Sequence, residues 1–168
     1  HAAPAMSAWA ARALALADLP GLLAVQRACY GAQYVEGHAV FARRLQSPAN
    51  LSPAITDAGG RVLAYLAAYR SLQGKVTPLH GDFDTVATPD TAYLHDMAVL
   101  PECTGQGLGP ALLAALPAQG LRYGALVAVQ GAQRYWARHG YQPQALACPT
   151  QRLHLAGYGP EAVYMLRE

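Results

Sequence analysis

Charged residues are scarce in this sequence, and that scarcity excludes several kinds of partner. Asp, Glu, Lys and Arg make up 13% of the 168 residues, and 12 basic side chains against 10 acidic ones give a formal net charge of +2. Lysine occurs only once, as Lys75. Nucleic acids and anionic membranes are bound by concentrated positive charge, which this chain lacks. We therefore expect neither a nucleic-acid partner nor a membrane partner.

Cysteine pairs, metal-ligand pairs and long apolar runs are lacking as well. The three cysteines, Cys29, Cys103 and Cys148, are odd in number and widely spaced, so they indicate neither a disulfide framework nor a zinc site. No histidine has a partner at metal-ligand spacing, and no apolar run is long enough to span a membrane. We expect free, buried cysteines, no metal and a reducing, cytoplasmic setting.

The patterns that are present predict one α/β domain. Hydrophobic residues form 53% of the sequence, and the length suits a single core. We expect the domain to span residues 6–168, with residues 1–5 a tag remnant or a disordered end. The order of the expected elements predicts a mixed central sheet flanked by helices. Strands are expected at 9–14, 54–56, 62–69, 92–100, 121–130 and 162–166, helices at 22–30, 37–45, 109–116 and 132–139, and a long loop at 73–89.

The segment 92–109 carries the chemistry, because a strand there runs through a glycine-rich turn into a helix. Gly105, Gly107 and Gly109 allow the backbone to approach a ligand closely, and the free N–H groups at the helix start favour a pyrophosphate. A dinucleotide fold needs an acidic residue about 20 positions later, and a nucleotide-triphosphate loop needs Gly-Lys-Ser/Thr. The sequence meets neither requirement.

Two stretches resemble motifs of the GNAT acetyltransferase superfamily. Val99-Leu-Pro-Glu-Cys-Thr-Gly-Gln-Gly-Leu-Gly109 is similar to its acetyl-CoA motif, with Thr104 where the superfamily has arginine or glutamine. Ala132-Gln-Arg-Tyr-Trp-Ala-Arg-His-Gly-Tyr141 is similar to its next motif. The resemblance implies a single GNAT domain with a V-shaped opening between the strand 92–100 and the strand near Leu126. Acetyl-CoA is then the implied cofactor.

The resemblance also implies which residues contact acetyl-CoA. Pantetheine and the thioester oxygen would be held by backbone groups of Met97, Ala98 and Val99, beside Trp136 of the following helix. The remaining contacts implied are those of the turn and helix start, namely Thr104, Gly105, Gln106, Gly107, Leu108, Gly109 and Pro110. The strand itself indicates an irregularity, because Leu94 lies on one phase of the alternation and Met97 and Val99 on the other. A β-bulge produces this change of phase.

The general base is expected at His95. The run Leu94-His95-Asp96-Met97-Ala98-Val99 is most similar to the arylalkylamine N-acetyltransferases, whose base histidine falls at this position. Diamine acetyltransferases have a glutamate there. An alkylammonium of pKa near 10 must lose a proton before it can attack, and an imidazole of ordinary pKa near 6.5 can accept that proton. We expect Asp96 to be structural or orienting.

The acid that protonates the departing thiolate is less evident. The superfamily often has a tyrosine for this role, and the matching position here is Trp136, which cannot supply a proton. Tyr135 is the adjacent candidate; Tyr30, Tyr141 or a water are alternatives, or the thiolate leaves unassisted.

Substrate contacts are expected before and within the second helix. Tyr30 and Tyr34 lie where similar enzymes cover the acceptor, and Glu36 is a candidate ligand of a substrate ammonium, although an acid on a loop is usually only solvated. The sequence therefore predicts an acetyl-CoA-dependent N-acetyltransferase, monomeric or homodimeric. It would acetylate the primary amine of a small molecule by direct attack in a ternary complex. A peptide or protein amine acetyltransferase and a non-catalytic acyl-CoA-binding regulatory module are the alternatives.

Overall fold

A computed structural model describes residues 8–168, so the expectation for residues 1–5 lies outside the described residues. Within 8–168 a seven-stranded sheet has the order β1-β2-β3-β4-β5-β7-β6. β4 and β5 are parallel, and the other neighbours are antiparallel. The predicted α/β fold with a mixed sheet is confirmed. The strands are β1 (Trp9–Ala13), β2 (Pro53–Asp57), β3 (Val62–Ser71), β4 (Thr91–Val99), β5 (Tyr123–Ala128), β6 (Gln142–Pro143) and β7 (Val163–Arg167).

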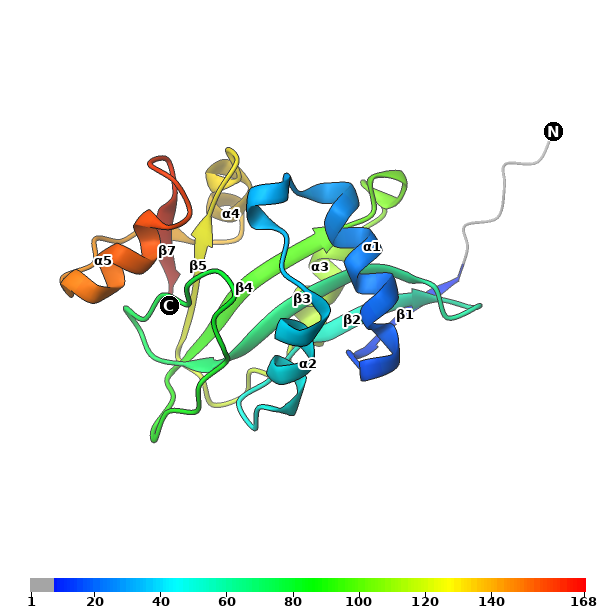
Figure 1. Ribbon diagram of the computed structural model, residues 1–168, viewed down its shortest axis with the longest axis horizontal. Coiled ribbons are helices and arrows are strands. Elements are labelled where there is room, and N and C mark those ends of the chain that lie inside the picture. The colour runs from blue at the N-terminus through cyan, green and yellow to red at the C-terminus, as the bar shows by residue number, and fades with distance from the viewer. Residues whose placement is uncertain (1–7) are drawn as a thin grey trace.

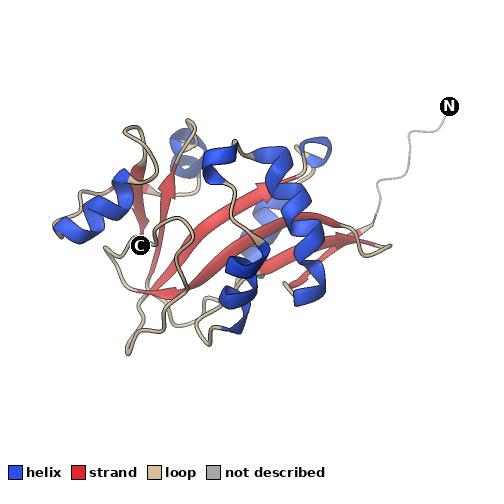
Figure 2. Cartoon of the chain, in the orientation of Figure 1, coloured by secondary structure: helices blue, strands red, loops and turns tan. Residues whose placement is uncertain are grey.

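Helices cover both faces of the sheet. In Figure 1, α1 and α2 lie in front of the central strands and α3 lies behind them, while α4 and α5 flank the β5–β7 end. Figure 2 shows the same layers, with the strands between helices. α1 packs on β3 and β4, and α3 packs on β1 to β4. The helices are α1 (Leu19–Cys29), α2 (His38–Gln46), α3 (Leu108–Ala115), α4 (Gln133–Arg138) and α5 (Pro149–Ala156).

The core lies along β3, of which only Arg70 is not buried. Apolar side chains leave water on both of its faces, because helices cover each of them. Among the described residues, every helix is too short or too polar to cross a membrane. Cys29 and Cys103 are partly buried, but Cys148 is exposed, so the expectation that all three are buried is wrong.

Several element boundaries differ from the sequence prediction. α1 begins at Leu19, earlier than expected, and the carboxylate of the preceding Asp18 pairs with Arg12 and accepts from the N–H of Ala15. The helix α3 begins at Leu108, after Gly107, and so earlier than expected. β6 and α5 were not predicted at all. β6 has two residues, and α5 buries none of its side chains, so neither produces a periodic apolar signal.

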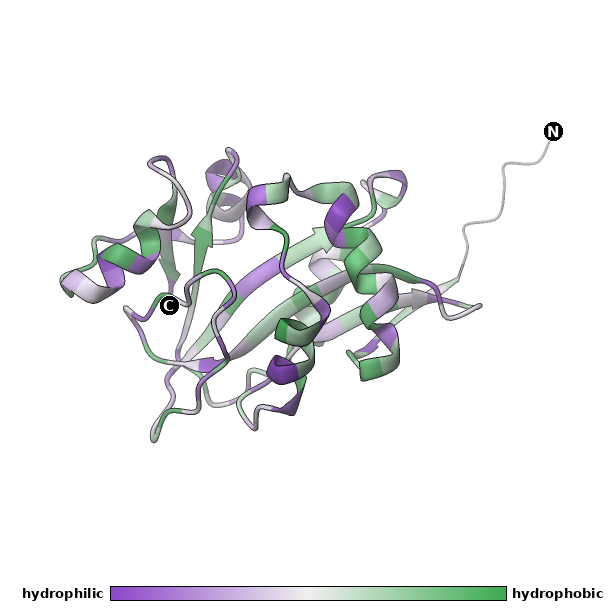
Figure 3. Cartoon of the chain, in the orientation of Figure 1, coloured by the Kyte–Doolittle hydropathy of each residue, from purple (hydrophilic) through white to green (hydrophobic). Residues whose placement is uncertain are grey.

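The predicted β-bulge is confirmed in β4. Ala67 of β3 lies opposite Asp96 and Ala68 lies opposite Leu94, so His95 is the extra residue. Beyond this point β4 leaves β5, because the parallel pairs run only from Thr91 to Leu94. The sheet of the described residues therefore opens between β4 and β5, where the resemblance implied a V-shaped opening. Figure 3 shows β4 becoming hydrophilic near its middle, between more apolar parts.

Candidate active site

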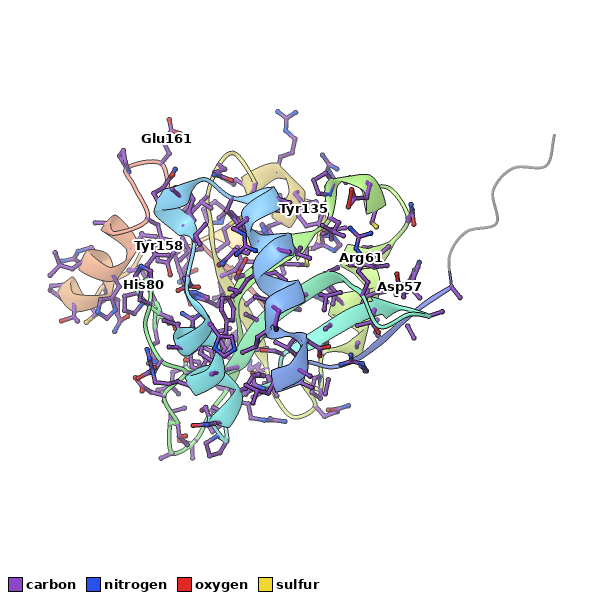
Figure 4. The ribbon with its side chains drawn as sticks, turned by 45° about the vertical axis from the view of Figure 1, so that its right-hand side comes forward. Asp57, Arg61, His80, Tyr135, Tyr158 and Glu161 are labelled. Carbon is purple, nitrogen blue, oxygen red and sulfur yellow. The ribbon has the colours of Figure 1, made fainter. Side chains whose placement is uncertain are left out.

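A cavity of about 300 Å³ lies where β4 and β5 separate. Its walls come from the connection between α1 and α2, the loop before β4, β4, β5, α4 and the segment after α5. Figure 4 labels two of these side chains, Tyr135 and Tyr158. Five lining side chains are aromatic: Tyr30, Tyr34, Tyr135, Trp136 and Tyr158.

His95 lines this cavity, and its imidazole is held by Glu36. Nε2 lies 2.9 Å from Glu36 Oε1, and both side chains are 2% exposed. The ring of Phe83 lies edge-on at 5.8 Å between centroids and that of Tyr158 at 6.4 Å. The bulge explains this placement, since the extra residue is turned toward the elements that cover the front of the sheet.

Glu36 is not the solvated loop acid expected from the sequence. It is 1% exposed, and Arg44 donates to both carboxylate oxygens at 2.8 and 2.6 Å. The N–H of His80 donates to Oε2 at 2.7 Å. Burial by itself raises the pKa of Glu36, but Arg44 and His95 hold that pKa well below its ordinary value. Its carboxylate already has four partners, so its role as an ammonium ligand stays a prediction without support from these contacts.

Asp96 lies on the same side of the sheet as His95. Its Oδ2 accepts a hydrogen bond from Tyr65, whose ring packs edge-on against Phe41 of α2. Oδ1 makes no hydrogen bond with residues 8–168. Burial raises the pKa of Asp96, and the hydrogen bond from Tyr65 opposes that effect. Adjacent residues of a regular strand point to opposite faces, and the bulge at His95 is what allows His95 and Asp96 to lie on one face.

The open edge of β4 presents backbone groups to the cavity. Leu100 donates to Leu63 at 2.9 Å, so by antiparallel alternation Ala98 faces β3 and Met97 and Val99 face away from it. The carbonyl of Met97 accepts from Tyr30 at 2.9 Å, and that of Val99 accepts from the Cys29 thiol at 3.1 Å. Of the three residues expected to hold pantetheine, only Met97 and Val99 therefore direct peptide groups toward the opening; Ala98 does not.

The glycine-rich turn has the conformation that an anion-binding loop needs. Gly105 and Gly107 have φ of +80° and +83°, and a Cβ on either would meet open space. The N–H groups of Leu108 and Gly109 lie in the first turn of α3, and Pro110 has none. An open backbone at a helix start fits the pyrophosphate of acetyl-CoA.

The two side chains next to these glycines have other surroundings. Thr104 donates its hydroxyl to the carbonyl of Pro101, so it is occupied within the turn. Gln106 is exposed. Their predicted cofactor contacts stay predictions.

Tyr135 and Trp136 have different surroundings although they are adjacent. Trp136 is 8% exposed and packs edge-on against Tyr141 at 5.5 Å, but it also lines the cavity. The Tyr135 hydroxyl lies so close to Gly109 that a Cβ there would be 2.7 Å from it. Burial raises the pKa of Tyr135. Tyr135 therefore lies between the start of α3 and the cavity, where its hydroxyl is protonated.

The loop before β4 forms one wall of the cavity, and no sequence pattern predicted its contacts. Val76, Thr77 and Phe83 are buried, and Leu79 lines the cavity. Tyr158 donates to the carbonyl of Thr77 at 2.5 Å. Tyr34 in turn donates to the carbonyl of Tyr158 at 3.0 Å. These contacts join segments that are distant in sequence, and the periodicity of apolar residues predicts no such contacts.

Arg44, which pairs with Glu36 beside the cavity, was not predicted from the sequence. Its guanidinium, 1% exposed, lies 5.3 Å from the centroid of Phe41 and 4.9 Å from that of Phe83. Its position three residues after Phe41 places both on one helix face, and this spacing is the signal that could have found it.

Comparison with known proteins agrees with this geometry. Residues 20–141 match the acetyltransferase (GNAT) family. No curated protein sequence matches the chain significantly.

Solved structures share the fold at low sequence identity. The loading GNATL domain of CurA from Lyngbya majuscula has a TM-score of 0.73 at 15% identity, covering 96% of this chain and 98% of its own. The ribosomal-protein-S18-alanine N-acetyltransferase from Escherichia coli has a TM-score of 0.67 at 19% identity, covering 95% and 93%. The PaiA N-acetyltransferase from Thermoplasma acidophilum, in complex with coenzyme A, has a TM-score of 0.64 at 14% identity, covering 96% and 99%.

Proposed function

The chain belongs to the acetyltransferase (GNAT) family, and from this premise we propose that it transfers the acetyl group of acetyl-CoA to the primary amine of a small molecule. The observation that carries the proposal is the cavity at the bulge of β4, with His95 in its lining. A cytoplasmic setting, where acetyl-CoA is made, goes with this activity. A monomer or a homodimer would suffice, because one chain supplies every residue named.

The described residues offer acetyl-CoA two places. The turn at Gly105 and Gly107 and the first N–H groups of α3 would hold the pyrophosphate. The peptide groups of Met97 and Val99 would hold the pantetheine along the open edge of β4. When bound, acetyl-CoA supplies a thioester carbonyl that an amine can attack.

His95 is proposed as the general base. A substrate ammonium gives one proton to the imidazole, and its nitrogen then forms a bond to the acetyl carbon while the carbon–sulfur bond breaks. The nitrogen gives up a second proton, which replaces the proton of the group that protonates the sulfur, and the sulfur leaves as a thiolate that takes one proton from that group. Tyr135 is proposed to supply that last proton, with Tyr30 as the alternative, because both hydroxyls reach the cavity wall.

The loop before β4 favours a small acceptor over a peptide. A peptide needs an open, extended groove, whereas here the loop containing Leu79 and Phe83 packs onto the site beside His95. Tyr30 and Tyr34 cover the cavity from the other end, in a T-shaped pair at 6.4 Å. A flat, apolar amine suits such a chamber.

The cavity's charges favour an amine that has no carboxylate. No lysine or arginine belongs to the described lining, whereas Glu36 and Asp96 both do. The carboxylate of an α-amino acid would lie beside these acids without a cationic partner. We therefore propose an arylalkylamine or similar simple amine as the substrate class.

The test is free-thiol release from acetyl-CoA with matched pairs of amines and amino acids, namely phenethylamine with phenylalanine and tyramine with tyrosine. We expect each amine to exceed its amino acid by about tenfold or more in kcat/KM, since an unpaired buried polar group costs about 1–3 kcal/mol. His95→Gln should lower kcat/KM by about 10²- to 10⁴-fold. His38→Gln, at an exposed histidine of α2, is the matched control.

The alternatives predict other results in the same assay. Release stimulated by peptides with free amino termini or lysines, and by no small amine, would replace this proposal with a peptide acetyltransferase. Coenzyme A binding without release for any acceptor would indicate a regulatory module. Full activity of His95→Gln would remove His95 as the base.

A further inference from the structure

We infer that Glu36 is a positioning residue: it accepts the Nε2 proton of His95 and thereby leaves Nδ1 as the nitrogen that receives the proton of the amine. This inference rests on the function proposed above, since it concerns how His95 serves that transfer. Glu36 itself would touch neither the amine nor acetyl-CoA.

The first step is the direction of the hydrogen bond between the two side chains. Glu36 Oε1 lies 2.9 Å from His95 Nε2. An ionised carboxylate can only accept hydrogen bonds, and the pKa of Glu36 is held well below its ordinary value despite burial. Nε2 must therefore carry a hydrogen. A neutral imidazole has one N–H group, so the lone pair is on Nδ1.

The second step is that Nδ1 has no other use in the described structure. It is buried and makes no hydrogen bond with residues 8–168, although its side chain lines the cavity. Buried polar groups are nearly always paired in folded proteins. An unpaired acceptor on a side chain that lines the cavity is suited to a proton from an amine bound there.

The third step is the rigidity with which Glu36 is held. Its carboxylate accepts two hydrogen bonds from Arg44 and one from the N–H of His80, in addition to that of His95. Its backbone is fixed as well, because Gln26 donates to its carbonyl at 2.8 Å and accepts from its N–H at 3.0 Å. Three separate segments thus converge on one carboxylate, which fixes the orientation of the imidazole.

The backbone of His80 has an uncommon conformation that supports this arrangement. Its φ is +64°, a left-handed conformation that residues with a side chain rarely adopt, and this turn brings its N–H to Glu36 Oε2. Such conformations persist where the surrounding structure requires them, often at functional sites.

The charges around His95 determine whether a substitution stabilises or destabilises its imidazolium form. Glu36 faces it from the α1–α2 connection, Asp96 adjoins it in β4, and Tyr158 lies against its ring from the segment after α5. Tyr93 of β4 lies beside the ring too, and Arg44 of α2 acts through Glu36. Removing the negative charge of Glu36 destabilises the imidazolium, whereas removing the positive charge of Arg44 stabilises it.

The experiment is a titration of the His95 ring by NMR in ¹⁵N-histidine-labelled protein, with the signal assigned from its loss in His95→Gln. We expect the midpoint of Glu36→Gln to lie below that of the unaltered protein and the midpoint of Arg44→Gln to lie above it. Glu168→Gln, at an exposed ion pair with Arg122, should leave it unchanged. Midpoints that stay fixed, or move in the same direction in both variants, would overturn the inference.

The NMR signals of the two His95 ring nitrogens in the unaltered protein give a test that does not require variants of buried residues to fold. At neutral pH the Nε2 signal should show a bonded proton and the Nδ1 signal none. A proton on Nδ1 instead would reverse the direction of the hydrogen bond and overturn the inference.

Activity gives a separate readout. The acid limb of kcat/KM against pH should move to lower pH in Glu36→Gln, with a fall of about tenfold or more at neutral pH, while KM for the amine changes little. The NMR results need no acceptor. Absence of thiol release in the unaltered protein would thus defeat the proposed function alone, whereas unmoved midpoints would defeat only the role of Glu36.

Discussion

Among single residues, Asp96 has a free-energy cost that depends on pH. Burial raises its pKa, so the folded state binds its proton more tightly than the unfolded state does. The stability that this protonated form contributes is present below the ordinary pKa of about 3.9 and is lost as pH rises through the folded value. Above that window the folded protein holds a buried carboxylate with one oxygen that no residue of 8–168 satisfies.

Asp96→Asn should therefore become stabilising relative to the unaltered protein as pH rises. The amide is neutral at all pH and can still accept from Tyr65. Between the ordinary pKa of Asp96 and its raised folded value, the free energy of unfolding of Asp96→Asn should gain about 1.4 kcal/mol per pH unit over that of the unaltered protein. Each kcal/mol corresponds to about 2–4 °C in Tm at this chain length. Thermal melts from pH 4 to 8 measure it. For Asp82→Asn, at an exposed pair with Arg43, the Tm difference from the unaltered protein should not change with pH. A Tm difference for Asp96→Asn that did not change with pH would contradict the prediction.

Residue-level prediction from the sequence succeeded where a local pattern was enough. The bulge at His95 follows from the change of alternation between Leu94 and Met97, which the chain itself displays. The burial of Glu36 did not follow, because Arg44, His80 and Gln26 come from three segments that only the fold brings together. Its position on a short loop indicated exposure, and the tertiary contacts determined the opposite.

Among the elements, the start of α3 depends on a glycine that also meets a neighbouring helix. A Cβ on Gly109 would lie 2.7 Å from the Tyr135 hydroxyl and 3.5 Å from Cε of Met97. Glycine thus permits α3 and α4 to approach beside the proposed thioester position. It is retained although alanine would favour the helix by about 0.5–1 kcal/mol.

Gly109→Ala and Tyr135→Phe should therefore be coupled. Alone, Gly109→Ala displaces the Tyr135 ring and destabilises the protein; with Tyr135→Phe the overlapping oxygen is gone, and alanine should stabilise α3. We expect a coupling free energy of about 0.5–3 kcal/mol in a double-mutant cycle measured by urea unfolding. Tyr141→Phe is the control, because the Tyr141 hydroxyl approaches Gly124 instead. Strict additivity for Gly109 and Tyr135 would show that no overlap exists.

Most of the elements that the sequence predicted have a buried face, although β1, which buries none of its residues, was predicted as well. Strands β2 to β5 and helices α1 to α4 each bury apolar side chains, and the sequence patterns placed them within a few residues. α5 buries no side chain and leaves Leu153 73% exposed, so its helical spacing has no apolar stripe. β6 pairs with β7 over only Gln142 and Pro143, too short for alternation to appear.

In the molecule as a whole, two parts of the sheet are joined by few contacts. β5, β7 and β6 connect to β1–β4 through four parallel pairs, from Thr91–Tyr123 to Leu94–Leu126. Past those pairs, Met97 and Val99 direct their N–H groups away from β3 without a strand partner among the described residues. A ligand lying along this edge would bridge both parts and add to the stability of the fold.

Acetyl-CoA should accordingly stabilise the protein and protect a specific set of amides. At about 100 times its Kd it should add about 2.7 kcal/mol, and hence about 5–11 °C in Tm. Hydrogen exchange should slow at the amides of Met97 and Val99, whereas that of Ala98, which faces β3, should not change. Adenosine 3′,5′-bisphosphate, which lacks pantetheine, is the control and should leave Met97 and Val99 unprotected. Equal protection of all three amides by acetyl-CoA would mean that the open edge of β4 is not where pantetheine lies.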